Sequence, residues 1–229
     1  MGIKIILAGA TGFIGGEVLQ QCLKNPAITS VVALSRHPLP EVAGISKVEV
    51  VIMQDFRHYP DEVLGKIAGA DGCIWCMTKA IVDRTLELDY PKAFAEAISN
   101  TIVEYEKPFR YIHLSARLVE NDPDKSLWIA GSMRKLKGEL QMIEVAEDTS
   151  IGRFWETRIA RPGMVVQRGA TFGEALCMLG STWTIRSDEL ALALIDTVVS
   201  GSNEQVIDTV TLRNRGQNLF KRKLESTTA

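Results

Sequence analysis

The sequence predicts an α/β protein with a single doubly wound parallel sheet and helices on both faces. Short apolar runs alternate along the chain with segments of helical spacing, and a glycine-rich turn follows the first run directly. Alternation of this kind is typical of parallel strands joined by right-handed crossovers. A composition of 46% hydrophobic and 24% charged residues fits an ordinary globular protein with a large core.

Each expected strand is a short apolar run, rich in β-branched residues and bounded by turn residues. In chain order these runs cover residues 3–8, 31–34, 48–53, 72–76, 109–115 and 157–160, with a last strand at 206–212. The strand 157–160 is expected to stop at Arg161-Pro162-Gly163, because proline lacks the N–H that a sheet requires.

Each expected helix carries apolar residues three or four positions apart, the spacing of one helix face. In chain order these segments cover residues 11–24, 61–67, 83–104, 132–147 and 188–200. The first is expected to end at Asn25-Pro26, and Pro91 either kinks the third or divides it in two. Because no long linker divides the pattern, we expect one domain, 1–212, followed by a polar, basic tail, 213–229, with a solvated end.

Charge and composition exclude several classes of protein. Lys and Arg number 26 against 28 Asp and Glu, a net charge of −2, which argues against binding nucleic acid through bulk charge. There is no apolar run long enough to cross a membrane and no recognisable signal peptide. Four cysteines are too few for a disulfide scaffold. We therefore expect a cytoplasmic protein whose partner is a small-molecule substrate; the sequence leaves the oligomeric state open.

Glycines at positions 9, 12 and 15 have a spacing that indicates dinucleotide binding, in the strand–turn–helix context that the motif requires. Gly9 allows the tight turn, Gly12 lets the backbone approach a pyrophosphate, and Gly15 lets the helix pack close to the strand. The free N–H groups of the helix N-terminus then attract the phosphates. The intervening residues expected beside the cofactor are Thr11, Phe13 and Ile14.

The end of the second strand indicates which dinucleotide binds. An NAD site carries an acidic residue there, whereas an arginine suits the 2′-phosphate of NADP. This chain has Ser35 and Arg36 at that point and no acidic residue before Glu41, which favours NADP over NAD. Asp55, just past the third strand, is a candidate for bonding the adenine amine, although an exposed loop aspartate is an equal alternative.

With these residues placed, the chain resembles the short-chain dehydrogenase/reductase superfamily, in its atypical branch with a Rossmann fold. Further landmarks agree with this resemblance: His113-Leu114-Ser115, Lys137-Gly138-Glu139 and Arg161-Pro162-Gly163. Within that branch the chain is similar to the NmrA-like and Tat-interacting-protein-like subgroup, and to the fungal averufin-oxidase family of polyketide tailoring enzymes. The resemblance covers about residues 1–212. Extended members have a larger C-terminal region, so a substrate pocket here is expected to be built from loops.

The resemblance implies a catalytic role for Ser115 and for Lys137, which would also hold the nicotinamide ribose, and it places Pro162 beside the cofactor. The family's catalytic tyrosine, four residues before the lysine, is replaced by Met133. Methionine cannot exchange a proton, and Met133 also fits an apolar helix stripe. Tyr90 is a candidate substitute acid.

Other patterns indicate no separate site. Cys73 and Cys76 form a C-x-x-C within an expected strand, where residues three apart face opposite sides, so neither a redox motif nor a metal site is expected. His37, His58 and His113 lie on separate segments, which also argues against a metal.

Three functions remain open. The first is an NADP-dependent oxidoreductase acting on a small, aromatic or polyketide-like substrate without the usual tyrosine. The second is a non-redox tailoring enzyme, such as an isomerase, dehydratase or cyclase, on the same scaffold. The third is an NmrA-like regulator that senses dinucleotides.

Overall fold

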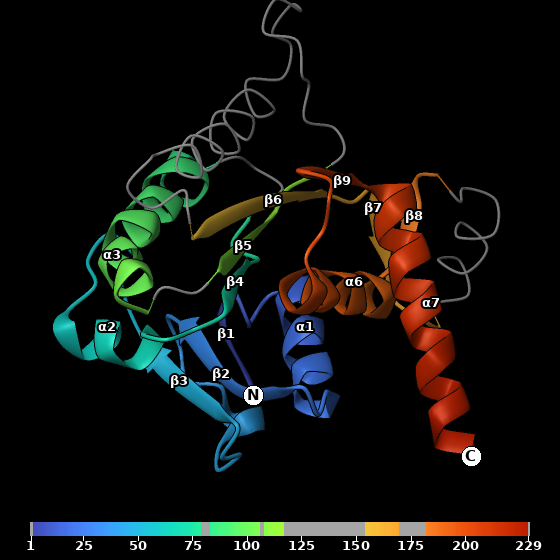
Figure 1. Ribbon diagram of the computed structural model, residues 1–229, viewed down its shortest axis with the longest axis horizontal. Coiled ribbons are helices and arrows are strands. Elements are labelled where there is room, and N and C mark those ends of the chain that lie inside the picture. Colours follow the sequence, from blue (N-terminus) through green and yellow to red (C-terminus); the bar gives the residue numbers. More distant parts are fainter. Residues whose placement is uncertain (1, 79–82, 106–107, 117–153, 170–181, 229) are drawn as a thin grey trace, which may run out of the picture.

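A seven-stranded parallel sheet forms the centre of the computed structural model, which describes residues 2–78, 83–105, 108–116, 154–169 and 182–228 (Figure 1). The strands lie in the order β3-β2-β1-β4-β5-β6-β9, and every neighbouring pair is parallel. Their bounds are β1 (Ile3–Ala8), β2 (Ile28–Ser35), β3 (Val48–Ile52), β4 (Gly72–Trp75), β5 (Phe109–Leu114), β6 (Trp155–Arg161) and β9 (Val206–Asp208). The expected fold class is therefore confirmed.

Helices cover both faces of this sheet, as Figure 1 shows. On one face α1 (Phe13–Lys24) and α6 (Ser187–Ser200) pack on alternate strand residues such as Leu7, Ala33 and Ile74. On the other face α2 (Asp61–Ile67) and α3 (Tyr90–Tyr105) cover the residues between them. Strand residues are buried on both faces because side chains alternate along each strand.

An aromatic cluster fills the core under α3. Its rings come from β4, β5, β6 and α3, and the closest pair is Phe109 and Trp155, whose ring centroids are 5.1 Å apart. Phe94 of α3 contacts four of these rings. Aromatic side chains bury large apolar areas, so this cluster fixes α3 against the sheet.

The segment expected as one helix, 83–104, has two parts. Residues Thr85–Asp89 form a π-helical turn, η2, which passes directly into α3. Pro91 is the second residue of α3, directly after η2, and its missing N–H leaves out one helix hydrogen bond at this junction, so the proline marks the boundary between the two parts. A π turn inside a helix is often found beside a functional site.

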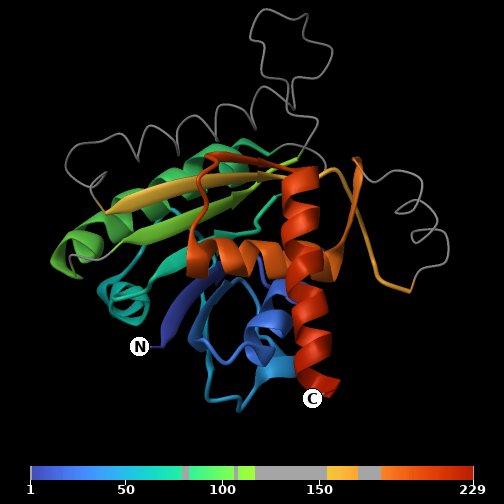
Figure 2. The same cartoon turned by 45° about the vertical axis from the view of Figure 1, so that its right-hand side comes forward.

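The C-terminal region differs most from expectation. A small two-stranded parallel sheet, β7 (Met164–Val166) with β8 (Thr184–Arg186), was not predicted. The strand expected at 206–212 ends at Asp208, and the polar segment from 213 belongs to a helix, α7 (Thr209–Thr228), whose described residues after 216 are half-buried or exposed. This helix packs on α6, as the two views in Figures 1 and 2 show: Leu212 is fully buried, and a Cβ on Gly216 would lie 2.1 Å from the Glu189 carbonyl oxygen.

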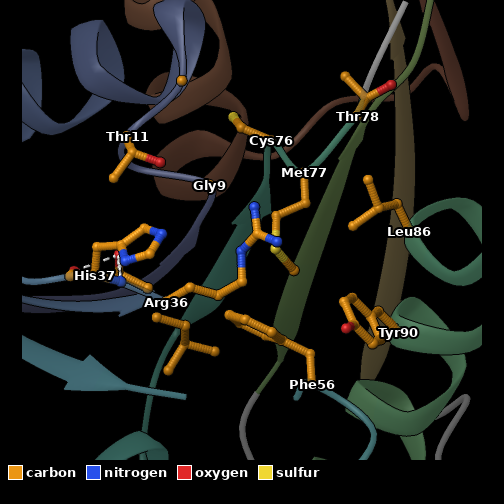
Figure 3. A pocket seen from close by; sticks show the side chains of 13 residues that line it. Gly9, Thr11, Arg36, His37, Phe56, Cys76, Met77, Thr78, Leu86 and Tyr90 are labelled. Carbon is orange, nitrogen blue, oxygen red and sulfur yellow. Dashed lines mark hydrogen bonds between the residues drawn. The ribbon is translucent and has the colours of Figure 1, made fainter. Parts of the chain in front are cut away.

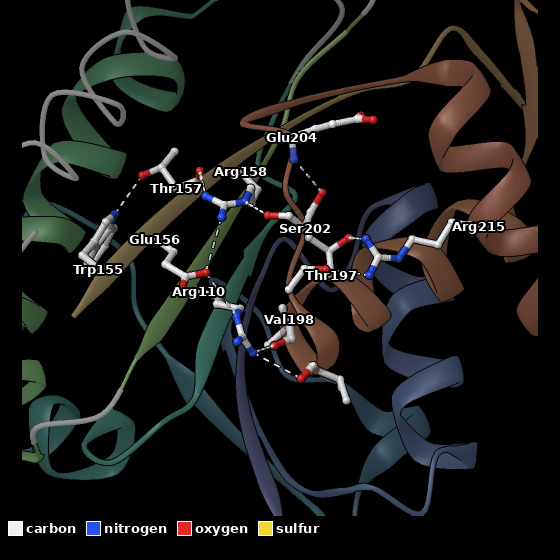
Figure 4. Close-up of polar contacts among 12 residues, drawn as sticks. Arg110, Trp155, Glu156, Thr157, Arg158, Thr197, Val198, Ser202, Glu204 and Arg215 are labelled. Carbon is white, nitrogen blue, oxygen red and sulfur yellow. Dashed lines mark hydrogen bonds and ion pairs between the residues drawn. The ribbon is translucent and has the colours of Figure 1, made fainter. Parts of the chain in front are cut away.

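Three arginines from three different elements bind the C-terminal end of α6 (Figure 4). Arg110 of β5 donates to the carbonyls of Val198 and Val199 at 2.8 and 3.2 Å. Arg158 of β6 and Arg215 of α7 donate to the next free carbonyls, those of Ser202 and Gly201. The last carbonyls of a helix have no partner within it and carry partial negative charge. These guanidinium groups supply the missing hydrogen-bond donors and a compensating positive charge.

Candidate cofactor-binding site

A pocket of about 130 Å³ lies at the carboxyl edge of the sheet, where β1 is flanked by β2 on one side and β4 on the other (Figure 3). The chain moves outward from β1 through β2 to β3 and then returns to place β4 on the opposite side of β1. This arrangement is a topological switch point, the position where open α/β sheets bind their ligands. The lining residues are Gly9, Thr11, Gly12, Leu34, Ser35, Arg36, His37, Phe56, Cys76, Met77, Thr78, Leu86 and Tyr90.

The glycine turn has the geometry that its spacing predicts. Gly9 has φ +89°, and a Cβ there would lie 2.8 Å from the Cys76 carbonyl carbon at the end of β4. A Cβ on Gly15 would lie 2.1 Å from the Gly9 carbonyl oxygen, so α1 approaches the turn more closely than a side chain allows. Gly12 lines the pocket and donates its N–H to Gly9 O at 3.0 Å. The N-terminus of α1 therefore opens beside the pocket.

Arg36 extends from the end of β2 into the pocket, as Figure 3 shows. Its guanidinium makes no hydrogen bond or ion pair with any residue that the structure describes. Among the described residues that line the pocket, none is acidic. The charge that faces this part of the pocket is therefore positive.

Ser35 contributes to the site indirectly. Its side chain is 5% exposed, and its hydroxyl donates to the His37 carbonyl at 2.7 Å while accepting the His37 N–H at 3.2 Å. The Ser35 hydroxyl therefore donates its proton to a backbone carbonyl of its own loop. Ser35 was expected to bind the cofactor; the structure shows that it fixes the backbone on either side of Arg36.

One wall of the pocket is apolar and is made by Phe56 after β3, Leu86 in η2 and Tyr90 at the start of α3. Tyr90 had been a candidate substitute acid, whereas Phe56 and Leu86 were not predicted. The ring centroids of Phe56 and Tyr90 are 5.4 Å apart. Together they make an apolar wall opposite the glycine turn. The only sequence signal for it was the position of Phe56 directly after Asp55.

Several residues expected near the cofactor do not line the pocket. Asp55 accepts a bidentate hydrogen bond from Arg57, with Nη2 2.9 Å from Oδ2, and Arg57 holds the pKa of that carboxyl below its usual range. Phe13, Ile14 and Gly15 belong to the turn and helix around the pocket, and Pro162 lies buried after β6. Lys137 and Met133 lie outside the described residues.

Ser115 follows β5 at the same carboxyl edge of the sheet. Its N–H donates to the Ala160 carbonyl at 2.8 Å, which holds the residue against the end of β6. The side chain is 6% exposed, and Oγ has no hydrogen-bond partner among the described parts of the chain. Ser115 is not among the residues that line the pocket, so the predicted catalytic residue lies at the same edge of the sheet but outside the described pocket wall.

The C-x-x-C segment is structural, as expected. Cys73 belongs to the core under α3 and Cys76 to the core under α1 and α6, so the two thiols face opposite sides of β4. Burial raises the pKa of Cys76 to about 12 and that of Cys73 well above its usual value. Across the described residues, no three histidine, cysteine or acidic side chains gather as metal ligands would.

Comparison with known proteins finds a curated relative of part of the chain and several solved structures with a similar fold. No family profile matches the chain. The curated relative that it matches is the leucinostatins biosynthesis cluster protein T of Purpureocillium lilacinum, 46% identical over 73 residues. These residues are 32% of this chain and 27% of the relative, so the chain aligns with about a quarter of that protein.

Solved structures resemble the whole fold. The PhqB reductase domain from Penicillium fellutanum has a TM-score of 0.63 and 18% identity, covering 90% of this chain and 65% of its own length. Gre2 from Candida albicans, solved with NADPH, also gives 0.63, at 16% identity and coverage of 90% and 77%.

The dTDP-glucose 4,6-dehydratase of Bacillus anthracis, solved with NAD, gives a TM-score of 0.66 at 8% identity, covering 96% of this chain and 81% of that one. Likeness at these identities establishes a shared fold. In the part of the chain that the structure describes, no helix has both the length and the apolar character to cross a bilayer. The chain thus has the Rossmann fold found in these nicotinamide-dependent reductases and dehydratases.

Proposed function

We propose that the chain is an NADP(H)-dependent oxidoreductase of the short-chain dehydrogenase/reductase type. The observation that carries the proposal is the pocket at the switch point, where Arg36 has no partner among the described residues and no carboxylate is present. A nucleotide phosphate beside a carboxylate would be repelled, whereas a guanidinium can donate two parallel hydrogen bonds to it. The glycine turn supplies the second phosphate site, because Gly12 leaves room for a pyrophosphate beside the N-terminus of α1.

The residues of the site suit reduction of a carbonyl group. Bound NADPH supplies a hydride to carbon. The resemblance assigns to Ser115 a hydrogen bond to the carbonyl oxygen, and its position after β5, at the same carboxyl edge of the sheet as the pocket, is consistent with that role. The resemblance assigns the ribose contact to Lys137. With Met133 at the tyrosine position, the proton must come from another group, from water or from the substrate itself.

We infer the substrate class from the resemblance, and the comparisons support a role in secondary metabolism. The curated relative is a biosynthesis cluster protein, and one similar structure is a fungal reductase domain. Both support a small substrate of secondary metabolism, aromatic or polyketide-like, as the resemblance to the averufin-oxidase family implies. The aligned region covers only part of each of these two proteins, so their activities are properties of those longer proteins.

The unpartnered Ser115 hydroxyl also suits a second candidate function, a non-redox reaction on the same scaffold. One similar structure is a dehydratase, and a buried hydroxyl can orient a carbonyl in dehydration or isomerisation as well. The two candidates differ in whether NADPH is consumed. A purely sensing role does not explain why a buried hydroxyl faces this edge of the sheet.

Replacing Arg36 with alanine tests the cofactor assignment. The affinity for NADPH is expected to fall by about 10- to 100-fold, the value of one charge-assisted hydrogen-bonding group, while the affinity for NADH changes little. Isothermal titration with both nucleotides measures the difference. The matched control is Arg57→Ala, which removes an exposed arginine held by Asp55 on the neighbouring loop. Equal affinities of the unmodified protein for NADPH and NADH would refute the NADP assignment.

Replacing Ser115 with alanine tests the catalytic assignment. Loss of a transition-state hydrogen bond is expected to lower kcat about 100-fold, with NADPH affinity unchanged. The assay is NADPH absorbance with a panel of quinones and aromatic ketones. Ser99→Ala is the control, because that hydroxyl lies on the exposed side of α3 and bonds only its own helix. If the unmodified protein converts substrate without consuming NADPH, the non-redox function replaces this one.

A further inference from the structure

A groove of about 250 Å³ lies between the C-terminal parts of α1 and α7. α6 packs against both helices, and in Figures 1 and 2 both extend below it. The described residues that line the groove are Gln21, Lys24, Phe220, Lys223 and Leu224, and none of them lines the pocket beside the glycine turn. The groove is therefore a separate cavity, at the opposite end of α1 from that turn.

One part of the groove is apolar. Leu224 is 55% exposed, and Phe220 lies four residues earlier, on the same face of α7. The guanidinium carbon of Arg168 is 4.1 Å from the centre of the Phe220 ring, and Arg168 is ion-paired with Asp188 at the start of α6. Because this contact between a cation and an aromatic ring fixes Phe220, its apolar surface is already in place for a ligand.

Two lysines give the groove positive charge. Lys223 Nζ donates to Gln21 Oε1 at 3.1 Å, which orients the lysine toward α1. Lys24 is exposed and makes no hydrogen bond or ion pair with any residue that the structure describes. A cation in the last turn of a helix often binds the free carbonyls there, but at α1 this is done by Lys47, which donates to the Leu23 carbonyl at 3.1 Å. The ammonium of Lys24 is thus available to a ligand.

Carboxylates of neighbouring turns do not face the groove. None of the described lining residues is acidic. Glu17, one turn before Gln21, accepts a hydrogen bond from the Gln21 side-chain amide at 2.8 Å and is not a lining residue. A ligand in the groove therefore meets two cations, one amide and an apolar surface. This combination is complementary to an anion that carries an apolar group.

We propose that the groove binds a small carboxylic acid with an apolar body. Its carboxylate accepts hydrogen bonds from Lys24 and Lys223, and its apolar part lies against Phe220 and Leu224. Pockets for drug-sized ligands have volumes of about 300–1,000 Å³, so a groove of about 250 Å³ suits a smaller molecule. This site is independent of the proposed function, because it shares no lining residue with the pocket beside the glycine turn.

Titration calorimetry with octanoate, octanamide and butyrate tests both halves of the groove. Octanoate is expected to bind saturably at one site. Octanamide has the same chain without the charge, and butyrate has the charge with a shorter chain. Each is expected to bind at least about fivefold more weakly than octanoate. If octanoate does not bind, or if octanamide binds equally well, the lysines do not hold a carboxylate and the proposal is wrong.

Three variants locate the binding site. Lys24→Met is expected to weaken octanoate about fivefold and to leave octanamide unchanged. Leu224→Asp is expected to weaken octanoate more than about tenfold, because it removes apolar contact and adds a repelling charge. Lys221→Met, an exposed lysine of the same helix outside the groove, is the matched control and is expected to change nothing. Unchanged octanoate binding in both Lys24→Met and Leu224→Asp would place the site elsewhere and refute the proposal.

Other occupants of this surface give different results, each of which would overturn the proposal. Displacement of octanoate by NADPH would place it in the pocket beside the glycine turn. A dimer in size-exclusion chromatography that Leu224→Asp dissociates would make the groove an interface between two copies of the chain. Sedimentation with phosphatidylserine vesicles, without binding of octanoate, would indicate that a lipid surface covers it.

Discussion

Replacing Gly15 with alanine is expected to prevent the native fold from forming or to leave it without nucleotide binding. The added methyl would lie 2.1 Å from the Gly9 carbonyl oxygen and 2.8 Å from its carbon. Both are backbone atoms of the turn, so neither can move without shifting α1 away from β1. Overpacking of a rigid contact costs about 1–3 kcal/mol and sometimes more, and here the displaced atoms also form the phosphate site.

Gly65→Ala is the matched control for this change. Gly65 lies inside α2, and a Cβ there has open space within 4 Å. Alanine is a better helix former, so this variant is expected to gain roughly 0.5–1 kcal/mol of stability. Urea denaturation followed by circular dichroism measures both. A Gly15→Ala protein with native stability and unchanged NADPH affinity would contradict the close approach of α1 to the turn.

Replacing Arg110 with methionine is expected to destabilise the fold by about 2–4 kcal/mol. Methionine keeps much of the side-chain volume but leaves the carbonyls of Val198 and Val199 without the donors that bind them at 2.8 and 3.2 Å. It also leaves Glu156, 3.3 Å from Arg110 Nε, with Arg158 as its remaining cation among the described contacts.

Arg84→Met is the control for Arg110. Arg84 is 75% exposed and lies 3.7 Å from Asp89, so its loss is expected to cost less than about 0.5 kcal/mol. Thermal and urea unfolding of both variants at one ionic strength gives the comparison. If the two variants lose the same stability, the guanidinium of Arg110 does not hold the end of α6.

The sequence predicted most of the fold because its strands are buried on both faces. Runs such as residues 5–8 are apolar without interruption, and only the ends of the strands were misjudged, by a few residues. The strands β7 and β8 were missed because each has three residues, too few for a period to be visible. A proline and a glycine before β7 also suggested that regular structure had ended.

The last helix was missed for a different reason. α7 packs on α6 through Leu212 and through Gly216, which has no side chain and so adds nothing to an apolar pattern. Arg215 adds a polar contact that resembles a solvated residue in the sequence. A helix held by backbone approach and guanidinium groups has no apolar stripe from which it could be recognised.

The parts of the site that are formed by residues close together in the sequence were predicted correctly as lining the pocket. The glycine turn and Arg36 are short, contiguous signals, and both line the pocket. Phe56 and Leu86 were missed because they come from separate segments, which meet only when the loop after β3 and η2 have packed, whereas Tyr90 had been singled out as a candidate acid. Ser35 also lines the pocket, and its two hydrogen bonds to the His37 backbone could not be predicted, because a serine hydroxyl at this position can point to a ligand or to its own loop.

The order of the pocket residues along the chain has a consequence for how such proteins can diverge. All of them lie between Gly9 and Tyr90, whereas Ser115 and Pro162 come from later segments. If the proposed function holds, exchange of the later segments between related genes would change the substrate and leave the described part of the nucleotide pocket intact. An engineer could likewise graft a new C-terminal portion onto this N-terminal portion and inherit a ready-made nucleotide site, provided that β4 and β5 keep their pairing.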